Sequence, residues 1–412
     1  MSKEKRRVPK LRFPGFTEDW EQRKADYIFK SVTDKGYPEL PVLSASQELG
    51  MVYRDQNGID IQHDKKNETS YKRVLPGQFV IHLRSFQGGF AYSEIEGITS
   101  PAYTVMSFKN SSEQYGLFWK HVFKSETFIK RLETITYGIR DGRSISFSDF
   151  KSLLLQYPSF SEQKLIGDSI AVIERGITLH QRKLDNLKLK KKALLQKLFP
   201  KNGERYPELR FPGFTDAWEQ RKLGDFYTFK NGLNKEKVYF GYGDSIVNFT
   251  DVFHNRQIYS STLKGKVFVN KKELENFKVK EGDLFFTRTS ETIDEIGFPA
   301  VVMEPMERVV FSGFVLRGRA EKNDPLVNIF KSYIFFTDNF RSEMKKKSSM
   351  TTRALTSGTA LKEMYFSYPK DLEEQTKIGE ILLRLDNVIT LHQRKLDHLQ
   401  LQKKALLQQM FV

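Results

Sequence analysis

The chain has 412 residues, enough for two or three domains that each bury a core, and its formal net charge of +16 suggests a polyanionic partner. The absence of cysteine excludes disulfides, thiolate zinc sites and cysteine nucleophiles. No apolar run approaches the ~20 residues of a membrane-spanning helix and no signal-peptide stretch is recognisable, so we expect a cytoplasmic protein without membrane contact.

Two segments occur twice, in the same order, and they organise the chain. Leu11–Lys24 returns as Leu209–Lys222 with two of 14 positions different, and Ile177–Asp185 returns as Ile389–Asp397. The stretches between the copies share almost nothing, which indicates one structural unit used twice with two unlike inserts. The repeats divide the chain into 1–24, 25–159, 160–199, 200–222, 223–371 and 372–412, of which 25–159 and 223–371 are variable regions of mixed α/β type.

The first variable region follows Trp20–Lys24, which predicts a short opening helix, and continues with strands predicted at 78–83 and 103–108. An Arg in a polar loop can fork onto a guanine edge while its neighbours contact phosphates. Each such Arg is also compatible with a solvated loop or a phosphate contact. The net charge of the region does not distinguish these roles, because the region holds 16 basic and 15 acidic residues. The candidate DNA contacts are Arg84, Ser85, Gln87, Arg140 and Arg143.

Residues 160–199 and 372–411 carry mostly apolar residues at alternating four- and three-residue steps, which predicts two long coiled-coil helices. Ser159 and Asp371 are N-cap residue types, each followed three positions later by a Glu, as in a capping box. About 40 residues give a rod of about 60 Å. The seam consists of Ile166, Ile170, Ile173, Ile177, His180, Leu184 and Leu187 in the first copy, and Ile378, Leu382, Leu385, Ile389, His392, Leu396 and Leu399 in the second.

The second variable region resembles the first in pattern rather than in sequence. Trp218–Lys222 predicts another short helix, and strands are predicted at 266–270, 284–287 and 308–316. The region holds 23 basic and 19 acidic residues, so any nucleic-acid contact must use selected faces. The candidate DNA contacts are Arg288, Ser290, Thr292 and Arg353.

The duplication also predicts how the long helices pair. Two copies of one helix related by a pseudo-two-fold axis pack antiparallel, which would bring His180 and His392 together at the middle of the coiled coil. A polar seam residue fixes register at some cost in stability, whereas a metal role is disfavoured because no carboxylate or cysteine stands at ligand spacing. The lysines from Lys188 to Lys197 suit a solvated helix face, and they equally suit phosphates or an acidic partner.

The paired Leu-Arg-Phe-Pro-Gly-Phe-Thr-(Glu/Asp)-x-Trp-Glu-Gln-Arg-Lys and Ile-Thr-Leu-His-Gln-Arg-Lys-Leu-Asp segments resemble those of the specificity subunits of type I restriction–modification systems, over the whole chain. The resemblance implies an α+β fold with two target recognition domains, each reading one half of a bipartite double-stranded DNA site. It implies an antiparallel coiled coil that sets the gap and docks two methyltransferase subunits, with restriction and translocase subunits in the full complex.

The same resemblance implies a non-catalytic chain in a complex that methylates adenine and defends against phage. S-adenosylmethionine, ATP and Mg would be bound by partner subunits, with no cofactor or metal in this chain. The motifs of a lone methyltransferase or of an ATPase phosphate loop are absent, since Gly265-Lys266 lacks both the upstream Gly and the following Ser/Thr. Glu343-Met344-Lys345 has the Glu-x-Lys spacing of metal nucleases but no Pro-Asp partner precedes it. The remaining alternative is a coiled-coil adaptor with two protein-binding heads.

Overall fold

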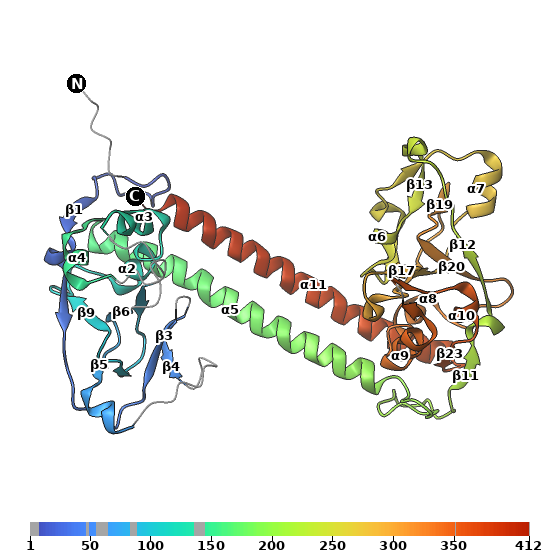
Figure 1. Cartoon of the computed structure of the whole chain (residues 1–412), viewed down its shortest axis with the longest axis horizontal. Coiled ribbons are helices and arrows are strands. Elements are labelled where there is room, and N and C mark those ends of the chain that lie inside the picture. Colours follow the sequence, from blue (N-terminus) through green and yellow to red (C-terminus); the bar gives the residue numbers. More distant parts are fainter. Residues whose placement is uncertain are drawn as a thin grey trace. The chain divides into compact units, whose positions relative to one another are not determined.

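The computed structural model describes residues 8–46, 49–54, 65–82, 89–135, 145–350 and 352–411. The chain forms two compact units: unit 1 comprises Met1–Gln181 with Arg394–Val412, and unit 2 comprises Arg182–Gln393 (Figure 1). Each unit therefore contains part of both long helices, α5 (Phe160–Lys197) and α11 (Leu372–Gln409). No helix in the described ranges is both long enough and apolar enough to cross a bilayer.

Unit 1 is built on an antiparallel four-stranded sheet with three smaller strand pairs. The sheet runs in the order β2 (Phe29–Val32), β9 (Thr104–Phe108), β6 (Phe79–Ile81), β7 (Phe90–Tyr92). The pairs are β1 (Glu21–Lys24) with β10 (Leu154–Tyr157), β3 (Leu43–Ser46) with β4 (Gly50–Tyr53), and β5 (Lys72–Val74) with β8 (Gly97–Thr99). The short helices are α1 (Ala25–Ile28), α2 (Gly116–Val122), α3 (Glu126–Ile135) and α4 (Phe147–Ser152).

Unit 2 repeats this sheet order although its sequence is unrelated. Its main sheet runs β12 (Tyr227–Asn231), β20 (Val315–Ala320), β16 (Leu284–Thr287), β18 (Pro299–Val302), β14 (Gln257–Ile258). A second sheet runs β15 (Lys266–Val267), β13 (Phe240–Val247), β19 (Val309–Phe311). A third sheet runs β17 (Thr289–Ser290), β22 (Ala354–Leu355), β21 (Ser349–Met350). A fourth consists of β11 (Glu219–Lys222) paired with β23 (Tyr365–Tyr368). The short helices are α6 (Phe249–Val252), α7 (Lys271–Phe277), α8 (Asn328–Ile334), α9 (Asp338–Lys347) and α10 (Gly358–Lys362).

The short helices predicted at Trp20–Lys24 and Trp218–Lys222 are wrong. Both segments are strands, β1 and β11, and each pairs antiparallel with the strand that leads into the long helix of its region, β10 or β23. The strand pairing satisfies the backbone groups of these residues and leaves the preceding tryptophan buried at 2% or less exposure.

Two predicted strands of the second variable region also differ from the structure. The strand predicted at 266–270 is limited to β15, because Asn270 caps α7 by accepting from the Glu273 amide at 2.9 Å. The strand predicted at 308–316 is two strands in different sheets, β19 and β20. The turn at Ser312–Phe314 separates them, and there the Val315 amide donates to the Ser312 carbonyl at 3.1 Å.

The long helices begin as predicted, but their acidic residues do not form capping boxes. Asp371 accepts hydrogen bonds from the Glu373 and Glu374 amides at 2.7 and 3.3 Å. The side chain of Glu374 instead forms a paired ion contact with Arg210 (2.7 and 2.8 Å), and Glu162 does the same with Arg12 (2.8 and 2.8 Å). Both glutamates are 1% exposed, so each needs an opposite charge beside it, which a half-buried arginine supplies.

The repeated Leu-Arg-Phe-Pro-Gly segment has the same role in each unit. In unit 1 the Leu11 amide donates to the Gln409 carbonyl at 2.9 Å, at the end of α11, and in unit 2 the Leu209 amide donates to the Lys197 carbonyl at 2.8 Å, at the end of α5. Arg12 or Arg210, the next residue, then reaches the glutamate in the first turn of the other long helix. The duplicated segment therefore joins the end of one long helix to the start of the other within its unit.

The variable domains pack closely on the long helices because each helix has a glycine at the crossing. A Cβ on Gly167 would lie 2.9 Å from the Phe118 amide nitrogen of α2, and one on Gly379 would lie 2.8 Å from the Ile329 side chain of α8. In unit 1 the two helix segments run in opposite directions. Glu174 pairs with Lys403, whereas Gly176, later in α5, lies beside Leu399, which is earlier in α11. Helix residues such as Ile166 thus join the aromatic core of the domain that they support.

Candidate nucleic-acid interface

Arg288 lies where the central sheet of unit 2 gives way to a small peripheral sheet. It follows the fully buried strand β16 directly, and β17 begins at the next residue. Its amide donates to the Phe314 carbonyl at 3.1 Å, and its carbonyl accepts from the Thr356 amide at 3.0 Å. The backbone of Arg288 is therefore fixed on both sides, so its half-buried side chain leaves from a rigid element.

The structure brings Arg353 next to this segment. Strand β17 pairs antiparallel with β22, matching Thr289 with Leu355 and Ser290 with Ala354, and Arg353 immediately precedes β22. The Arg353 guanidinium lies 3.0 Å from the Glu291 carboxylate, with both side chains mostly exposed. An exposed pair of this kind contributes little to stability, so the arginine can exchange its partner for a DNA base or phosphate at small cost.

Ser290 and Thr292 shape the same loop. Ser290 is 7% exposed, and its hydroxyl accepts from the Thr292 amide at 3.3 Å, which holds the turn after β17. Thr292 is exposed, and its hydroxyl donates to Glu295 at 3.4 Å. Of the four candidates in unit 2, Arg353 and Thr292 therefore face solvent, Arg288 does so in part, and Ser290 holds the turn.

Three exposed apolar side chains beside this loop were not among the sequence candidates. Phe314 is 65% exposed, Met350 is 51% exposed and Leu355 is 41% exposed. The Ser-Gly-Phe turn that carries Phe314 was hidden in the sequence by the β-branched residues on both sides of it. Phe314 lies in the turn whose carbonyl accepts from the Arg288 amide, and an exposed ring near an arginine is a combination that nucleic-acid interfaces use for stacking and base-edge contacts.

The candidates of the first variable region lie outside the described residues. These are Arg84, Ser85, Gln87, Arg140 and Arg143. The described strand before the first three, β6, is equivalent to β16 by its place in the sheet, and β7 follows it as β18 follows β16.

In unit 1, a half-buried charge cluster joins the variable domain to both long helices. Glu174 of α5 lies 2.7 Å from Lys403 of α11 and 3.4 Å from Lys120 of α2. Burial works against ionisation of Glu174, but His121, when it is protonated at low pH, together with Lys403 and Lys120 outweighs burial and lowers the pKa of Glu174 to about 2. His121 is fully buried beside this cluster, and burial lowers its pKa to about 3, so it is neutral at pH 7.

Unit 2 has a cluster at the equivalent positions, each 212 residues away in the repeat register. Asp386 of α11 is bonded to Lys191 of α5, and Tyr333 of α8 donates to the same carboxylate at 2.9 Å. Arg256 lies 3.9 Å from Asp386, and its guanidinium stacks 3.7 Å from the centre of the Phe336 ring. Burial lowers the pKa of Lys191, and the charge of Arg256 adds to this effect. One lysine of the basic run at 188–197 is therefore structural.

Comparison with known proteins identifies the family. Residues 215–401 match the family model described as the type I restriction modification DNA specificity domain. The chain is similar to the crystal structure of a type I restriction–modification S subunit from M. genitalium, with a TM-score of 0.59, 14% identity, and 98% and 99% of the two chains covered. A structure described for complex assembly and conformational transition of the type I system matches at a TM-score of 0.50 and 15% identity, over 98% and 99%.

Residues 215–401 thus carry the type I restriction modification DNA specificity domain, and the chain as a whole shares the fold of the S subunit from M. genitalium. The family model covers the second variable domain and most of α11, which includes Arg288, Arg353 and Asp386 but not Lys191 of α5. The specificity-subunit family recognised from the repeated segments is thus confirmed, as is the mixed α/β fold.

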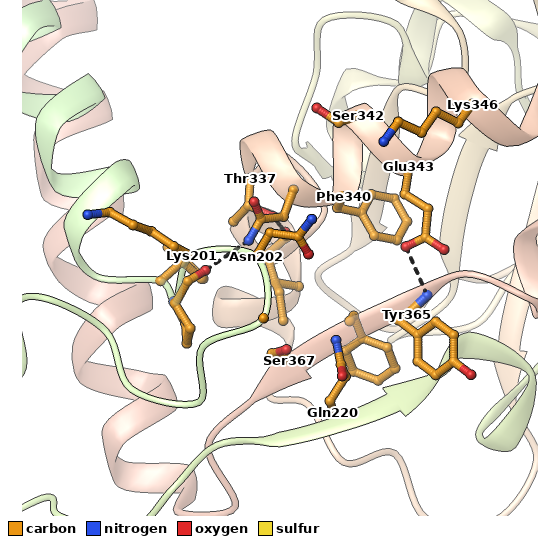
Figure 2. A pocket seen from close by; sticks show the side chains of 16 residues that line it. Lys201, Asn202, Gln220, Thr337, Phe340, Ser342, Glu343, Lys346, Tyr365 and Ser367 are labelled. Atoms are coloured by element: carbon orange, nitrogen blue, oxygen red, sulfur yellow. Dashed lines mark hydrogen bonds between the residues drawn. The ribbon is translucent and has the colours of Figure 1, made fainter.

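A cavity of about 320 Å³ lies in unit 2 and is lined by none of the candidate residues of the arginine loop. It is bounded by the linker at Lys201 and Asn202, by α9, and by β11 and β23 (Figure 2). The equivalent place in unit 1 has only about 10 Å³, because Arg131 occupies it and donates to the Leu154 carbonyl (3.1 Å) and to Gln156 (2.8 Å). Unit 2 has the shorter Glu343 at the equivalent position.

The Glu343-Met344-Lys345 triplet does not converge on a nuclease-like site in this cavity. Figure 2 shows the Glu343 carboxylate directed at Tyr365, whose amide donates to it at 3.2 Å. Lys345 bonds instead to Asp294, and Met344 between them is fully buried. Among the described residues no three His, Asp or Glu side chains are grouped as metal ligands are.

Proposed function

We propose that this chain is the DNA sequence-specificity subunit of a type I restriction–modification complex and reads a bipartite site. Each target recognition domain reads one half-site, and a paired-helix spacer made of α5 and α11 keeps the two half-sites in phase. The single observation that carries the proposal is the duplicated set of contacts, Arg12–Glu162 and Arg210–Glu374, which mounts two domains of unlike sequence in the same way.

The domain of unit 2 has the chemistry of a reader. Arg288 leaves a backbone-fixed strand end, Arg353 is exposed at the other end of the β17–β22 pair, and Phe314 presents a ring in the turn that is bonded to the Arg288 amide. Bidentate contacts of arginine with guanine give about 1–3 kcal/mol of discrimination against a wrong base. Since the surrounding loops differ in sequence between the two variable regions, the two half-sites are expected to differ.

The two long helices are proposed to form an antiparallel coiled coil with pseudo-two-fold symmetry. Every seam position from Ile166 to Leu187 and from Ile378 to Leu399 is buried or half-buried, as a seam requires. A helix of 38 residues is about 57 Å long, which exceeds the ~34–36 Å of one DNA turn and so suffices as a spacer. His180 and His392 would fix the register at its middle.

The subunit is proposed to work through partners. Two methyltransferase subunits, docked on the paired helices, would bind S-adenosylmethionine and methylate adenine, and restriction and translocase subunits would use ATP and Mg. The chain itself would supply only the recognition of the DNA sequence, because its charged and polar clusters serve packing and DNA contact. The complex would act in the cytoplasm. This division of labour would place phage defence under the control of two exchangeable reading domains.

A region swap tests the proposal. Cells would express the chain with residues 25–159 replaced by the corresponding region of another specificity subunit, together with the methyltransferase, and methylated adenines would be mapped across the genome. One half-site should change while the other half-site and the gap stay the same. If both halves change together, the two-reader arrangement is wrong. If methylation ignores sequence while both domains capture proteins, the adaptor alternative holds.

A further inference from the structure

Unit 2 presents an exposed cluster of aromatic rings that the reading loops do not include. Tyr239, Tyr242 and Phe268 are 38%, 52% and 47% exposed, and we call these three rings the aromatic patch. Tyr242 stacks on Phe268 with ring centres 5.9 Å apart, and the Phe268 amide donates to the Tyr239 carbonyl at 2.8 Å. Contiguous exposed rings of this kind mark a binding surface more often than a solvated one.

The backbone holds the patch in place by a bulge in β13. The register of β13 on β15 shifts between Phe240 and Asp244, so the Gly241–Gly243 segment projects from the sheet. Gly243 has φ of 90°, and a Cβ there would lie 2.8 Å from the Val267 carbonyl oxygen, so only glycine fits. Arg308 fixes the base of the bulge by a paired contact with Asp244 at 2.6 and 2.9 Å.

Positive charge surrounds the rings. The Lys235 ammonium lies 4.7 Å from the Tyr239 ring centre and 5.6 Å from that of Phe268, and it is held by Glu273 at 2.7 Å. Since Asp244 and Glu273 are already neutralised by Arg308 and Lys235, exposed lysines outnumber the remaining exposed acids Glu236 and Glu275. These lysines are Lys237, Lys266, Lys271 and Lys272.

The patch is continuous with the candidate reading loop. Phe314 follows Gly313, whose amide donates to the Leu233 carbonyl at 2.9 Å, and a Cβ on Gly313 would meet Asn234. Lys235 comes next in the chain and lies over the patch. Contacts therefore lead without a break from Arg288 through Phe314 to Tyr239. Figure 1 shows β13 at the end of unit 2 away from α9 and β23.

We propose that the aromatic patch and its lysines form a second DNA-contact surface, which binds the duplex flanking the half-site that unit 2 reads. The rings would pack on sugars and base edges, and the lysines would contact phosphates, so the contact adds affinity without sequence preference. A protein partner is disfavoured because lysine is depleted from protein interfaces and enriched in DNA interfaces. This inference rests on the proposed function, since it extends the same DNA interface.

The test compares two duplexes that carry the mapped bipartite site. One ends at the edge of the half-site read by unit 2, and the other continues for about one further helical turn. The full chain, assembled with its methyltransferase subunits, is titrated with each duplex as wild type, as Tyr242→Ala/Phe268→Ala and as Lys271→Gln/Lys272→Gln. Tyr206→Ala removes a ring of similar exposure, 56%, elsewhere in unit 2 and is the matched control.

The double ring variant should bind the extended duplex about tenfold more weakly and the trimmed duplex as wild type does. The lysine variant should show a smaller salt dependence on the extended duplex only, and the methylated sequence should not change in either. Unchanged binding by both variants, or equal losses on both duplexes, overturns the inference. So does intact DNA binding with failed subunit assembly, which would mark a protein interface. If the wild type itself ignores the bipartite site, the proposed function fails as well.

Discussion

Replacing His121 with tyrosine tests how the half-buried charge cluster of unit 1 couples to pH. The substitution copies unit 2, where Tyr333 occupies the equivalent position of α8 and donates to Asp386 at 2.9 Å. His121 is fully buried, and neither ring nitrogen has a hydrogen-bond partner among the described residues. Its neighbours are Glu174 on α5, Lys120 and Lys124 at α2, and Lys403 on α11.

The expected magnitude follows from the pKa of His121, which burial lowers from 6.5 to about 3. The unfolded chain binds a proton at this residue below pH 6.5, whereas the folded unit does not until near pH 3. Stability from the neutral imidazole is therefore present above pH 6.5 and is lost as the pH falls. One pKa unit corresponds to about 1.4 kcal/mol, so unit 1 should lose about 2 kcal/mol between pH 7 and pH 5 through this residue.

The assay follows unfolding of unit 1 alone by tryptophan fluorescence in urea. A Trp218→Phe background leaves Trp20 and Trp119, both buried in unit 1. In this background the free energy of unfolding is compared at pH 7 and pH 5 for His121 and for His121→Tyr. Only the difference between the two proteins is assigned to position 121. Glu174 contributes little in this window, because its own loss begins as the pH falls through 4.5.

The histidine protein should lose about 2 kcal/mol more than the tyrosine variant on acidification. Equal losses would show that His121 is not held neutral. A smaller loss with histidine would show that His121 is protonated in the fold and paired with Glu174, which would refute the assignment of burial as the dominant cause.

Four further predictions concern the frame, the spacer and the reader. Arg12→Met should lower the unfolding free energy of unit 1 by about 3–5 kcal/mol in urea titrations, because it leaves buried Glu162 without an opposite charge. The double variant Arg12→Met/Glu162→Met should recover most of this loss. The control Arg23→Ala, which breaks an exposed ion pair, should not change the unfolding free energy measurably. His180→Leu with His392→Leu should raise the melting temperature in calorimetry, and a marked decrease would count against their placement on the seam. Matched short insertions in α5 and α11 should widen the gap in methylation maps and preserve both half-sites; a changed half-site would contradict the spacer. Arg288→Ala should weaken binding to the bipartite duplex by about 1–3 kcal/mol and relax the base preference at one position of one half-site. The control is Arg341→Ala, because the Arg341 guanidinium donates to the Gly297 and Asp294 carbonyls within unit 2. This variant should leave the methylated sequence unchanged.

The family, the duplication and the long helices could be predicted from the sequence because their signals are local or periodic. A 3.5-residue apolar period over Phe160–Lys197 leaves few alternatives to a long helix, and the cyclic order of the repeats requires two similar mounts. The same reasoning proposed Arg288 and Arg353 as loop arginines, yet it could not show that they lie at the two ends of one strand pair, β17 with β22. Because Arg353 comes 65 residues after Arg288, no local or periodic pattern in the sequence indicates that their strands pair.

The sequence by itself determined the organisation of the chain: one repeated frame, two variable domains of unlike sequence, and two long helices. Only the tertiary structure decided what the repeated residues do. Glu162 and Glu374 have capping-box spacing, but half-buried arginines 150 and 164 residues away claim them, because an ionised carboxylate at 1% exposure is stable only beside an opposite charge. Likewise, Glu21–Lys24 forms a strand because β10, which lies about 130 residues away in the sequence, pairs with its backbone groups.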